Sequence, residues 1–344
     1  MRSILQIIAV LAATSAAVLA QPIAANATRT LIGSDGVVND IAFFADGSRL
    51  IGGGSDSMVR IWNLADGSVA RAFDLADEVT GLALSPDGSK FAALVRNREF
   101  YLIDISEGKL LHRQTDGESQ AILFEPDGKG LLFAIRGGPV RRLDIETLRC
   151  RDLFDSGLET IHGMTSSTDH TLIALAGVPQ PPARGGRVAR SGRRGVAAPA
   201  APAAAPGRLV VFDAFGGAEK AQFLVEFPVP SALSRCPAFS HDAKQIAAVG
   251  SRTQVWSMIN GAPLWAAEGQ PDQLSVAFAP GGKLVAVGSS DSTVRLLLPD
   301  TGREIKSFSA GASQPVRALR FSPDGKTLAA TWGKDIALFG VPEP

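Results

Sequence analysis

The chain of 344 residues is poor in the residues that build reactive centres, with two cysteines, four histidines and one tyrosine. It contains no CxxC, HExxH, GxSxG, GxGxxG or P-loop motif. Such motifs place thiolates, imidazoles, a nucleophilic serine or backbone amides where metal, acyl or phosphate chemistry needs them. Without them, zinc binding, serine hydrolysis and nucleotide binding have no recognisable motif. We therefore expect no catalytic residue, no cofactor and no metal site, and interpret the chain as a non-enzyme.

The first 27 residues are unlike the rest. Arg2 is the only charge among them, an apolar run extends from Ile4 to Ala20, and Ala25–Ala27 fits the small-x-small cleavage rule. This pattern predicts a secretory signal peptide over residues 1–27 and a periplasmic or secreted bacterial protein. Cleavage after Ala20 and retention as a membrane anchor are the alternatives, although polar residues and alanines dilute the run for a spanning helix. After cleavage we expect no membrane span.

The formal net charge of zero hides an uneven distribution. The stretch "PPARGGRVARSGRRGVAAPAAPAAAPG", from Pro181 to Gly207, has no acidic residue and almost no large apolar one. Its basic residues are Arg184, Arg187, Arg190, Arg193 and Arg194. Setting aside these five arginines and Arg2 leaves 28 basic against 34 acidic residues, so the rest of the chain offers no basic surface by composition.

A turn of the type "SPDGK" recurs along the chain. The residue at its aspartate position has the numbers 46, 87, 127, 169, 242, 281 and 324, so the intervals are 41, 40, 42, 73, 39 and 43. Self-similarity at a fixed period is the signature of a repeat architecture. The sequence therefore has seven units of about 41 residues, of which the fourth is enlarged.

Each unit has four short apolar runs with alternating polarity, separated by Asp-Gly or Gly-containing turns. This pattern predicts antiparallel strands joined by hairpins. Four strands per unit in seven units predict an all-β, seven-bladed β-propeller over residues 28–344. The seventh unit ends after three strands, so we expect "TRTLIG" at Thr28–Gly33 to supply the fourth strand and close the ring, and its truncation to open the ring.

The unit length, the "FSPDGK" turn and pairs such as Ile103-Asp104 resemble the WD-repeat family, which has four strands per blade. The resemblance covers the whole chain after residue 27 and is specific for fold rather than for function. Only Trp62 and Trp256 keep the family's tryptophan, neither is followed by Asp, and the Gly-His dipeptide is missing. Bacterial quinoprotein-type or YVTN-type propellers are the second resemblance, suggested by "INGAPLW" at Ile259–Trp265.

The two cysteines fall on different blades in this scheme. Cys150 lies on the outer strand of blade 3 and Cys236 on the inner strand of blade 5, with blade 4 between them. A disulfide needs Cα atoms within about 7 Å. We therefore expect no bond between these cysteines.

The enlarged interval places the arginine-rich stretch inside blade 4. The predicted second strand is Thr171–Gly177 and the third is Arg208–Ala214, so Val178–Gly207 is a loop between them. Its Pro, Gly and Ala content predicts disorder. In propellers that resemble the WD-repeat family, this loop emerges on the same face as the loops between blades, a face that commonly binds partners.

The basic insert has three interpretations. Its arginines could contact nucleic-acid backbones, but the insert has no aromatic residue for base stacking and the chain is expected to be exported. They could contact an anionic envelope surface or an acidic partner. They could also be a solvated loop without a specific role.

A few other residues are candidates for partner contact. Asp56 and Asp291 lie in turns, where Asp usually caps the local backbone, although either could reach a ligand at the rim. His162, Arg235 and Arg317 precede the inner strands near the expected mouth of the central channel.

These observations favour a non-catalytic, monomeric scaffold that binds an unidentified protein or peptide. The alternative is a small-molecule-binding or enzymatic propeller with its site at the channel mouth. That alternative requires several convergent polar side chains there, whereas a flat rim of mixed polarity favours the scaffold.

Overall fold

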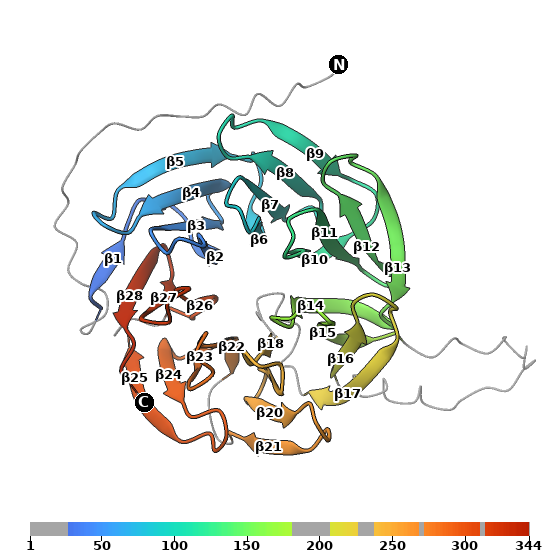
Figure 1. The fold of residues 1–344 in the computed structure, drawn as a ribbon. Coiled ribbons are helices and arrows are strands. Elements are labelled where there is room, and N and C mark those ends of the chain that lie inside the picture. The colour runs from blue at the N-terminus through green and yellow to red at the C-terminus, as the bar shows by residue number, and fades with distance from the viewer. Residues whose placement is uncertain (1–26, 181–206, 226–236, 268–271, 310–313, 344) are drawn as a thin grey trace, which may run out of the picture.

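The computed structural model describes residues 27–180, 207–225, 237–267, 272–309 and 314–343. In these ranges the chain forms seven four-stranded antiparallel sheets arranged as a ring around a central channel, and no helix (Figure 1). The predicted all-β, seven-bladed propeller is therefore confirmed. The signal-peptide prediction for residues 1–27 falls almost entirely outside the described residues, as does the predicted disorder of the insert over residues 181–206.

The first four blades follow one another along the chain, each running from the innermost to the outermost strand. Blade 1 contains β2 (Val38–Phe43), β3 (Arg49–Gly54), β4 (Met58–Asn63) and β5 (Val69–Asp74). Blade 2 contains β6 (Val79–Leu84), β7 (Lys90–Val95), β8 (Phe100–Asp104) and β9 (Leu110–Gln114). Blade 3 contains β10 (Ser119–Phe124), β11 (Gly130–Ile135), β12 (Pro139–Asp144) and β13 (Cys150–Asp155). Blade 4 contains β14 (Leu158–Ser166), β15 (Leu172–Pro179), β16 (Gly207–Asp213) and β17 (Glu219–Val225).

The last three blades complete the ring. Blade 5 contains β18 (Ala238–Phe239), β19 (Gln245–Ala248), β20 (Gln254–Ser257) and β21 (Pro263–Ala266). Blade 6 contains β22 (Gln273–Phe278), β23 (Val285–Ser289), β24 (Thr293–Leu297) and β25 (Glu304–Ser309). Blade 7 contains β26 (Leu319–Phe321), β27 (Thr327–Trp332), β28 (Asp335–Gly340) and, from the opposite end of the chain, β1 (Arg29–Leu31).

The outer strand of blade 7 comes from the N-terminal segment, as the sequence predicts. β1 pairs antiparallel with β28, with Leu31 opposite Ile336. The amide and the hydroxyl of Thr28 both donate to the carbonyl of Leu338, at 2.8 and 2.9 Å. Leu31 is buried between blades 7 and 1 in one cluster with Leu338 and Trp62. This pairing closes the ring and covers the sheet edge that β28 would otherwise expose.

The recurring turn has a physical basis in its serine and aspartate. In blades 2, 4, 5 and 7 the serine hydroxyl donates to the aspartate two residues later and accepts the amide five residues later. In blade 2, for example, Ser85 donates to Asp87 at 2.6 Å and accepts from Lys90 at 2.9 Å. The hydrogen bond from Ser85 lowers the pKa of Asp87 to about 2, so its turn keeps a charged cap across the physiological range.

The hydrophobic core is divided among the contacts between neighbouring blades. One cluster joins Ile51 and Ile61 of blade 1 to Phe91 of blade 2, and the other clusters repeat this arrangement around the ring. Each fully buried Ile, Leu or Phe contributes about 1.5–3 kcal/mol of transfer free energy. The fold is therefore held by many similar interfaces rather than by one central core.

Two details differ from the strand boundaries expected for blade 4. β15 extends to Pro179 and β16 begins at Gly207, so the insert is shorter than residues 178–207 at both ends. The longer pairing arises because β14 starts at Leu158 and runs beside β15 through two register shifts. Cys150 starts the outer strand of blade 3, as expected, and is a free thiol, whereas Cys236 lies outside the described residues.

Leu148 occupies a turn position that favours glycine. It lies between β12 and β13 with a φ of 55°, and the equivalent residues of other blades are glycines such as Gly67 and Gly217 at φ of 79° and 64°. For a residue with a Cβ, this left-handed conformation is less stable than the right-handed one by about 1–2 kcal/mol. We predict that Leu148→Gly raises the free energy of unfolding by about 1 kcal/mol, measured by urea denaturation.

The matched control is Glu146→Gly, two residues earlier in the same turn, where φ is not positive. There the added backbone freedom should lower stability. Equal effects of the two substitutions would show that strain at Leu148 does not limit the stability of this blade.

Candidate functional site

The propeller has two faces of different construction. The connections between blades and the turns between second and third strands lie on one face, which we call the loop face. The turns within the first and last strand pairs of each blade lie on the other, which we call the hairpin face. The chain leaves β15 and re-enters β16 on the loop face, so the arginine-rich insert starts and ends there, as the sequence predicts. Its five arginines lie outside the described residues.

A β-bulge recurs in the innermost strands and places one side chain of each such strand at the mouth of the channel. β2, β6, β10, β14 and β22 each shift register at the residue seven positions before the aspartate position of the turn. Arg317 holds this position in blade 7. The bulged residues of the other blades are Asn39, Thr80, Gln120, His162 and Leu274.

Three of these side chains connect neighbouring blades. Arg317 of blade 7 donates to the side-chain oxygen of Asn39 at 2.8 Å, and Asn39 donates to the carbonyl of Val79 in blade 2 at 2.8 Å. The side-chain oxygen of Gln120 accepts the amide of Ile161 in blade 4 at 2.6 Å. Several polar side chains at the channel mouth therefore form hydrogen bonds to the neighbouring blade.

The predicted channel-mouth residues share this one offset from the turn. His162 and Arg317 belong to blades 4 and 7, three blades apart around the ring (Figure 1). Burial lowers the pKa of His162, which favours its neutral form at pH 7. Arg235 holds the same position in the fifth unit and lies outside the described residues. Sequence reasoning found these three and missed Asn39, although the fixed offset from the turn identifies it.

The channel itself has a volume of about 640 Å³ and a wall of mixed polarity. Its charged pair is Asp40 of blade 1 and Arg320 of blade 7, with 3.2 Å between Oδ1 and Nη2. Asp40 is buried and also accepts the amides of Ile41 and Leu82 at 3.0 Å. The pair therefore joins the first and last blades along the channel wall, and its charges are mutually neutralised.

Charged residues form a belt of ion pairs on the loop face across blades 2, 3 and 4. Both signs alternate along this belt, and most members are partly exposed. The pairs are Arg96 with Glu78, Arg98 with Glu118 at 3.6 Å, and Arg136 with Glu118 at 3.3 Å and with Glu159 at 3.5 Å. The described loop face is thus a broad surface of mixed charge.

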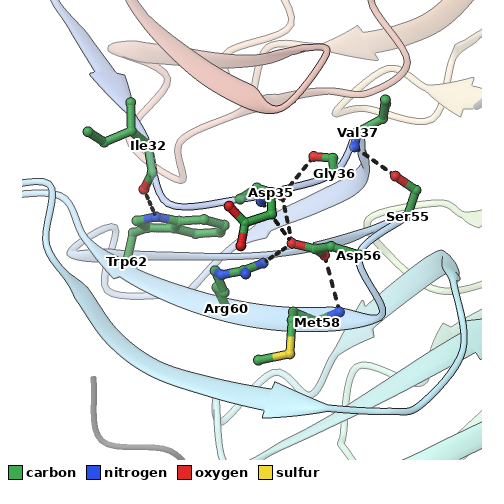
Figure 2. Close-up of polar contacts among 10 residues, drawn as sticks. Ile32, Asp35, Gly36, Val37, Ser55, Asp56, Met58, Arg60 and Trp62 are labelled. Atoms are coloured by element: carbon green, nitrogen blue, oxygen red, sulfur yellow. Dashed lines mark hydrogen bonds and ion pairs between the residues drawn. The ribbon is translucent and has the colours of Figure 1, made fainter. Parts of the chain in front are cut away.

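Asp56 lies in the turn between β3 and β4 and is the hub of a local network (Figure 2). Its carboxylate accepts from Arg60 at 2.6 Å and from the amides of Asp35 and Met58 at 3.1 and 3.2 Å. The side chains of Asp56 and Arg60 are each only 10% exposed. Burial raises the pKa of Asp56, but the hydrogen bonds and charge of Arg60 outweigh it and the pKa is lowered overall.

Beside this network, the indole of Trp62 donates to the carbonyl of Ile32 at 2.9 Å (Figure 2). The tryptophan thereby holds the segment that follows β1. Asp291 repeats the arrangement of Asp56 in blade 6, because it accepts the amide of Thr293 at 3.0 Å and pairs with Arg295 at 3.0 Å. Both aspartates reach the loop face but are engaged in capping their own turns.

The described residues contain no group of three or more His, Cys, Asp or Glu side chains that could hold a metal ion. No helix in the described ranges is long and apolar enough to cross a membrane. What the loop face offers is a wide surface of amide, hydroxyl and paired charged groups around the channel mouth.

Comparison with known families agrees with this geometry. The model described as "WD domain, G-beta repeat" matches residues 25–63, 264–296 and 302–339. The chain is a WD-repeat-like propeller. Each matched stretch begins in the outer strand of one blade and continues into the three inner strands of the next, and the first stretch includes β1, which closes blade 7. The sequence repeat of this chain is thus offset by one strand from the blade. Because of this offset, β1 near the N-terminus completes blade 7, whose other strands come from the C-terminal part of the chain.

Three fungal proteins show partial similarity. Eukaryotic translation initiation factor 3 subunit I of Coccidioides immitis is 30% identical over 114 residues, 28% of this chain and 34% of the relative. Ribosome biogenesis protein ERB1 of Chaetomium globosum is 41% identical over 66 residues, 19% of this chain and 8% of the relative. The protein of the same name from Aspergillus niger is 40% identical over 70 residues, 20% of this chain and 9% of the relative. The similarity spans about a third or less of each relative's length.

The Asp56 network makes the stability of blade 1 dependent on pH. Because the folded-state pKa of Asp56 is lowered, its contribution is present above the unfolded value of about 3.8 and is lost as the pH falls through the folded value. We predict that Asp56→Asn lowers the free energy of unfolding at pH 7 by about 2 kcal/mol, and that the difference from the unmodified protein shrinks as the pH falls below 4.

Thermal unfolding at a series of pH values measures this effect. Asp116→Asn is the control, since Asp116 is exposed and its carboxylate makes no hydrogen bond to the described residues. A difference for Asp56→Asn that stays constant with pH would contradict the role assigned to its charge.

Proposed function

We propose that this WD-repeat-like propeller is an exported, non-catalytic scaffold that binds a protein or peptide partner on its loop face. The observation that carries the proposal is the construction of the channel mouth. Side chains such as Arg317, Asn39 and Gln120 hydrogen-bond to neighbouring blades, and a belt of mixed charge extends across blades 2, 3 and 4 on the same face. A wide polar surface suits contact with a macromolecule better than enclosure of a small substrate.

Export is supported by the N-terminal sequence, whose single charge, apolar run and small-x-small site fit a signal peptide. We propose a periplasmic or secreted location on that basis. Partner binding is supported by the relatives, one of which is named as a subunit of a translation initiation factor. That name concerns the relative. From it we infer for this chain only that it also contacts other proteins.

The basic insert indicates the charge of the proposed partner. It starts and ends on the loop face, and its five arginines contrast with a body in which acidic residues exceed basic ones. We propose that the insert selects an acidic protein surface by charge and speeds the encounter.

We predict that replacing the five insert arginines by alanine abolishes capture of one acidic partner from the envelope fraction. The variant keeps the length of the insert and so isolates the charge. The measurement is affinity capture with the tagged full chain at two salt concentrations, with capture of the unmodified protein falling at the higher salt.

Arg149→Ala, at an exposed position of blade 3, is the control and should capture the same partner as the unmodified protein. Identical partner sets for all three proteins would overturn the role of the insert. Recovery of the chain from the cytoplasmic fraction with residues 1–27 intact would overturn export.

A further inference from the structure

Blade 3 departs from the other blades at one position of its contact with the next blade. Across every blade, four residues face one another in a row, one per strand, and this row packs on the following blade. The third residue of the row is apolar and almost fully buried in six blades: Ile61, Leu102, Val211, Val255, Leu296 and Leu338. In blade 3 it is Arg142, opposite Leu132 on β11 and Arg151 on β13.

Two further changes in blade 3 accommodate this arginine. Glu125 replaces the first residue of the recurring turn, and Arg142 donates to it from Nη2 at 2.8 Å and from Nε at 3.0 Å. Gly130 holds a position that carries a larger residue in the other blades. A Cβ at Gly130 would lie 2.0 Å from a Glu125 oxygen and 2.7 Å from Arg142 Nε. The three residues therefore form one co-adapted unit.

The contact of blade 3 with blade 4 is therefore polar at this place, where the other blades have an aliphatic side chain. A groove of about 680 Å³ opens between blades 3 and 4 on the hairpin face. Its volume is typical of ligand sites. The apolar part of its lining comes from both blades: Leu123, Phe124, Leu132, Leu153, Ile173 and Phe215.

Phe215 marks the rim of this groove. It lies in the turn between β16 and β17 and is 87% exposed, an unusual state for a phenylalanine. The equivalent turn residues in blades 3 and 6 are Glu146 and Asp300. A large apolar side chain at the edge of an apolar groove is suited to cover a ligand that enters it.

The charges of the groove are ordered from its inner to its outer end. Arg142 is neutralised by Glu125 and Asp144, and Asp152 by Arg141 at 2.7 Å. The side chain of Arg151, on the outer strand, makes no ion pair or hydrogen bond to another described residue. Asp127, on the inner turn, accepts only the amide of Lys129 among the described residues. An unbalanced positive charge therefore lies at the outer end and an unbalanced negative charge at the inner end.

We propose that this groove is a second binding site, for a short peptide segment of a partner protein. An aromatic or large aliphatic side chain of the peptide packs on Leu153 and Phe215. An acidic residue on one side of it pairs with Arg151, and a basic residue on the other side faces Asp127. The site lies on the hairpin face and is independent of the insert on the loop face.

The test starts from a random dodecapeptide library displayed on phage and selected on the full chain. The selected sequences should share one large apolar residue with an acidic residue on one side and a basic residue on the other. The affinity of the best synthetic peptide, measured by calorimetry, should fall about tenfold or more in Arg151→Glu and in Phe215→Ala. A lysine in place of the peptide's acidic residue should restore binding to Arg151→Glu.

Matched controls separate the groove from general effects of charge and exposure. Arg149→Glu changes the same charge on the same blade, and Ile259→Ala removes the 77% exposed residue at the turn position of blade 5 that corresponds to Phe215. Both should bind the peptide like the unmodified protein, as should the variant that lacks the insert arginines.

Selected peptides without the charge order, equal binding by Arg151→Glu and Arg149→Glu, or no selected peptide at all would overturn the proposal.

Discussion

The structure depends on the pairing of β1 with β28, which joins the two ends of the chain in one sheet. Each repeat contributes an outer strand to one blade and three inner strands to the next, so the last blade is complete only when the N-terminal segment returns to it. Leu31 fills the contact between blades 7 and 1, and Asp40 and Arg320 join the same two blades at the channel. With this closure blade 7 has four strands like the other blades, and the edge of β28 is covered.

The two surfaces proposed for binding differ in how far their residues follow the repeated pattern of the blades. On the loop face the bulged residues fasten one blade to the next, and the polar surface around them is broad and mixed in charge. On the hairpin face of blade 3, Glu125, Gly130 and Arg142 depart from the residues found at these positions in the other blades, and an open groove lies there. The repeated pattern builds the propeller, and the departure from it in blade 3 forms the groove that we propose as a second binding site.

Much of the fold could be predicted because the turn aspartates recur at an almost constant spacing and the apolar residues alternate between them. The closure by Thr28–Gly33 followed from counting strands in the seventh unit. The site was harder to predict. His162, Arg235 and Arg317 share one offset from the turn, and the same offset identifies Asn39 and Gln120, but only the register shows that the residue at this position is bulged. The groove needs the pairing of Arg142 with Glu125 across strands, which sequence spacing alone does not reveal.

Closure by β1 is the central claim, and thermal unfolding of two neighbouring alanine variants tests it most directly. Leu31 is 1% exposed and Ile32 is 44% exposed. Leu31→Ala should lower the free energy of unfolding by about 2–4 kcal/mol because it leaves a cavity between blades 7 and 1. Ile32→Ala should change it by no more than about 0.5 kcal/mol. Unfolding of both variants at the temperature of the unmodified protein would contradict the closure of the ring by β1.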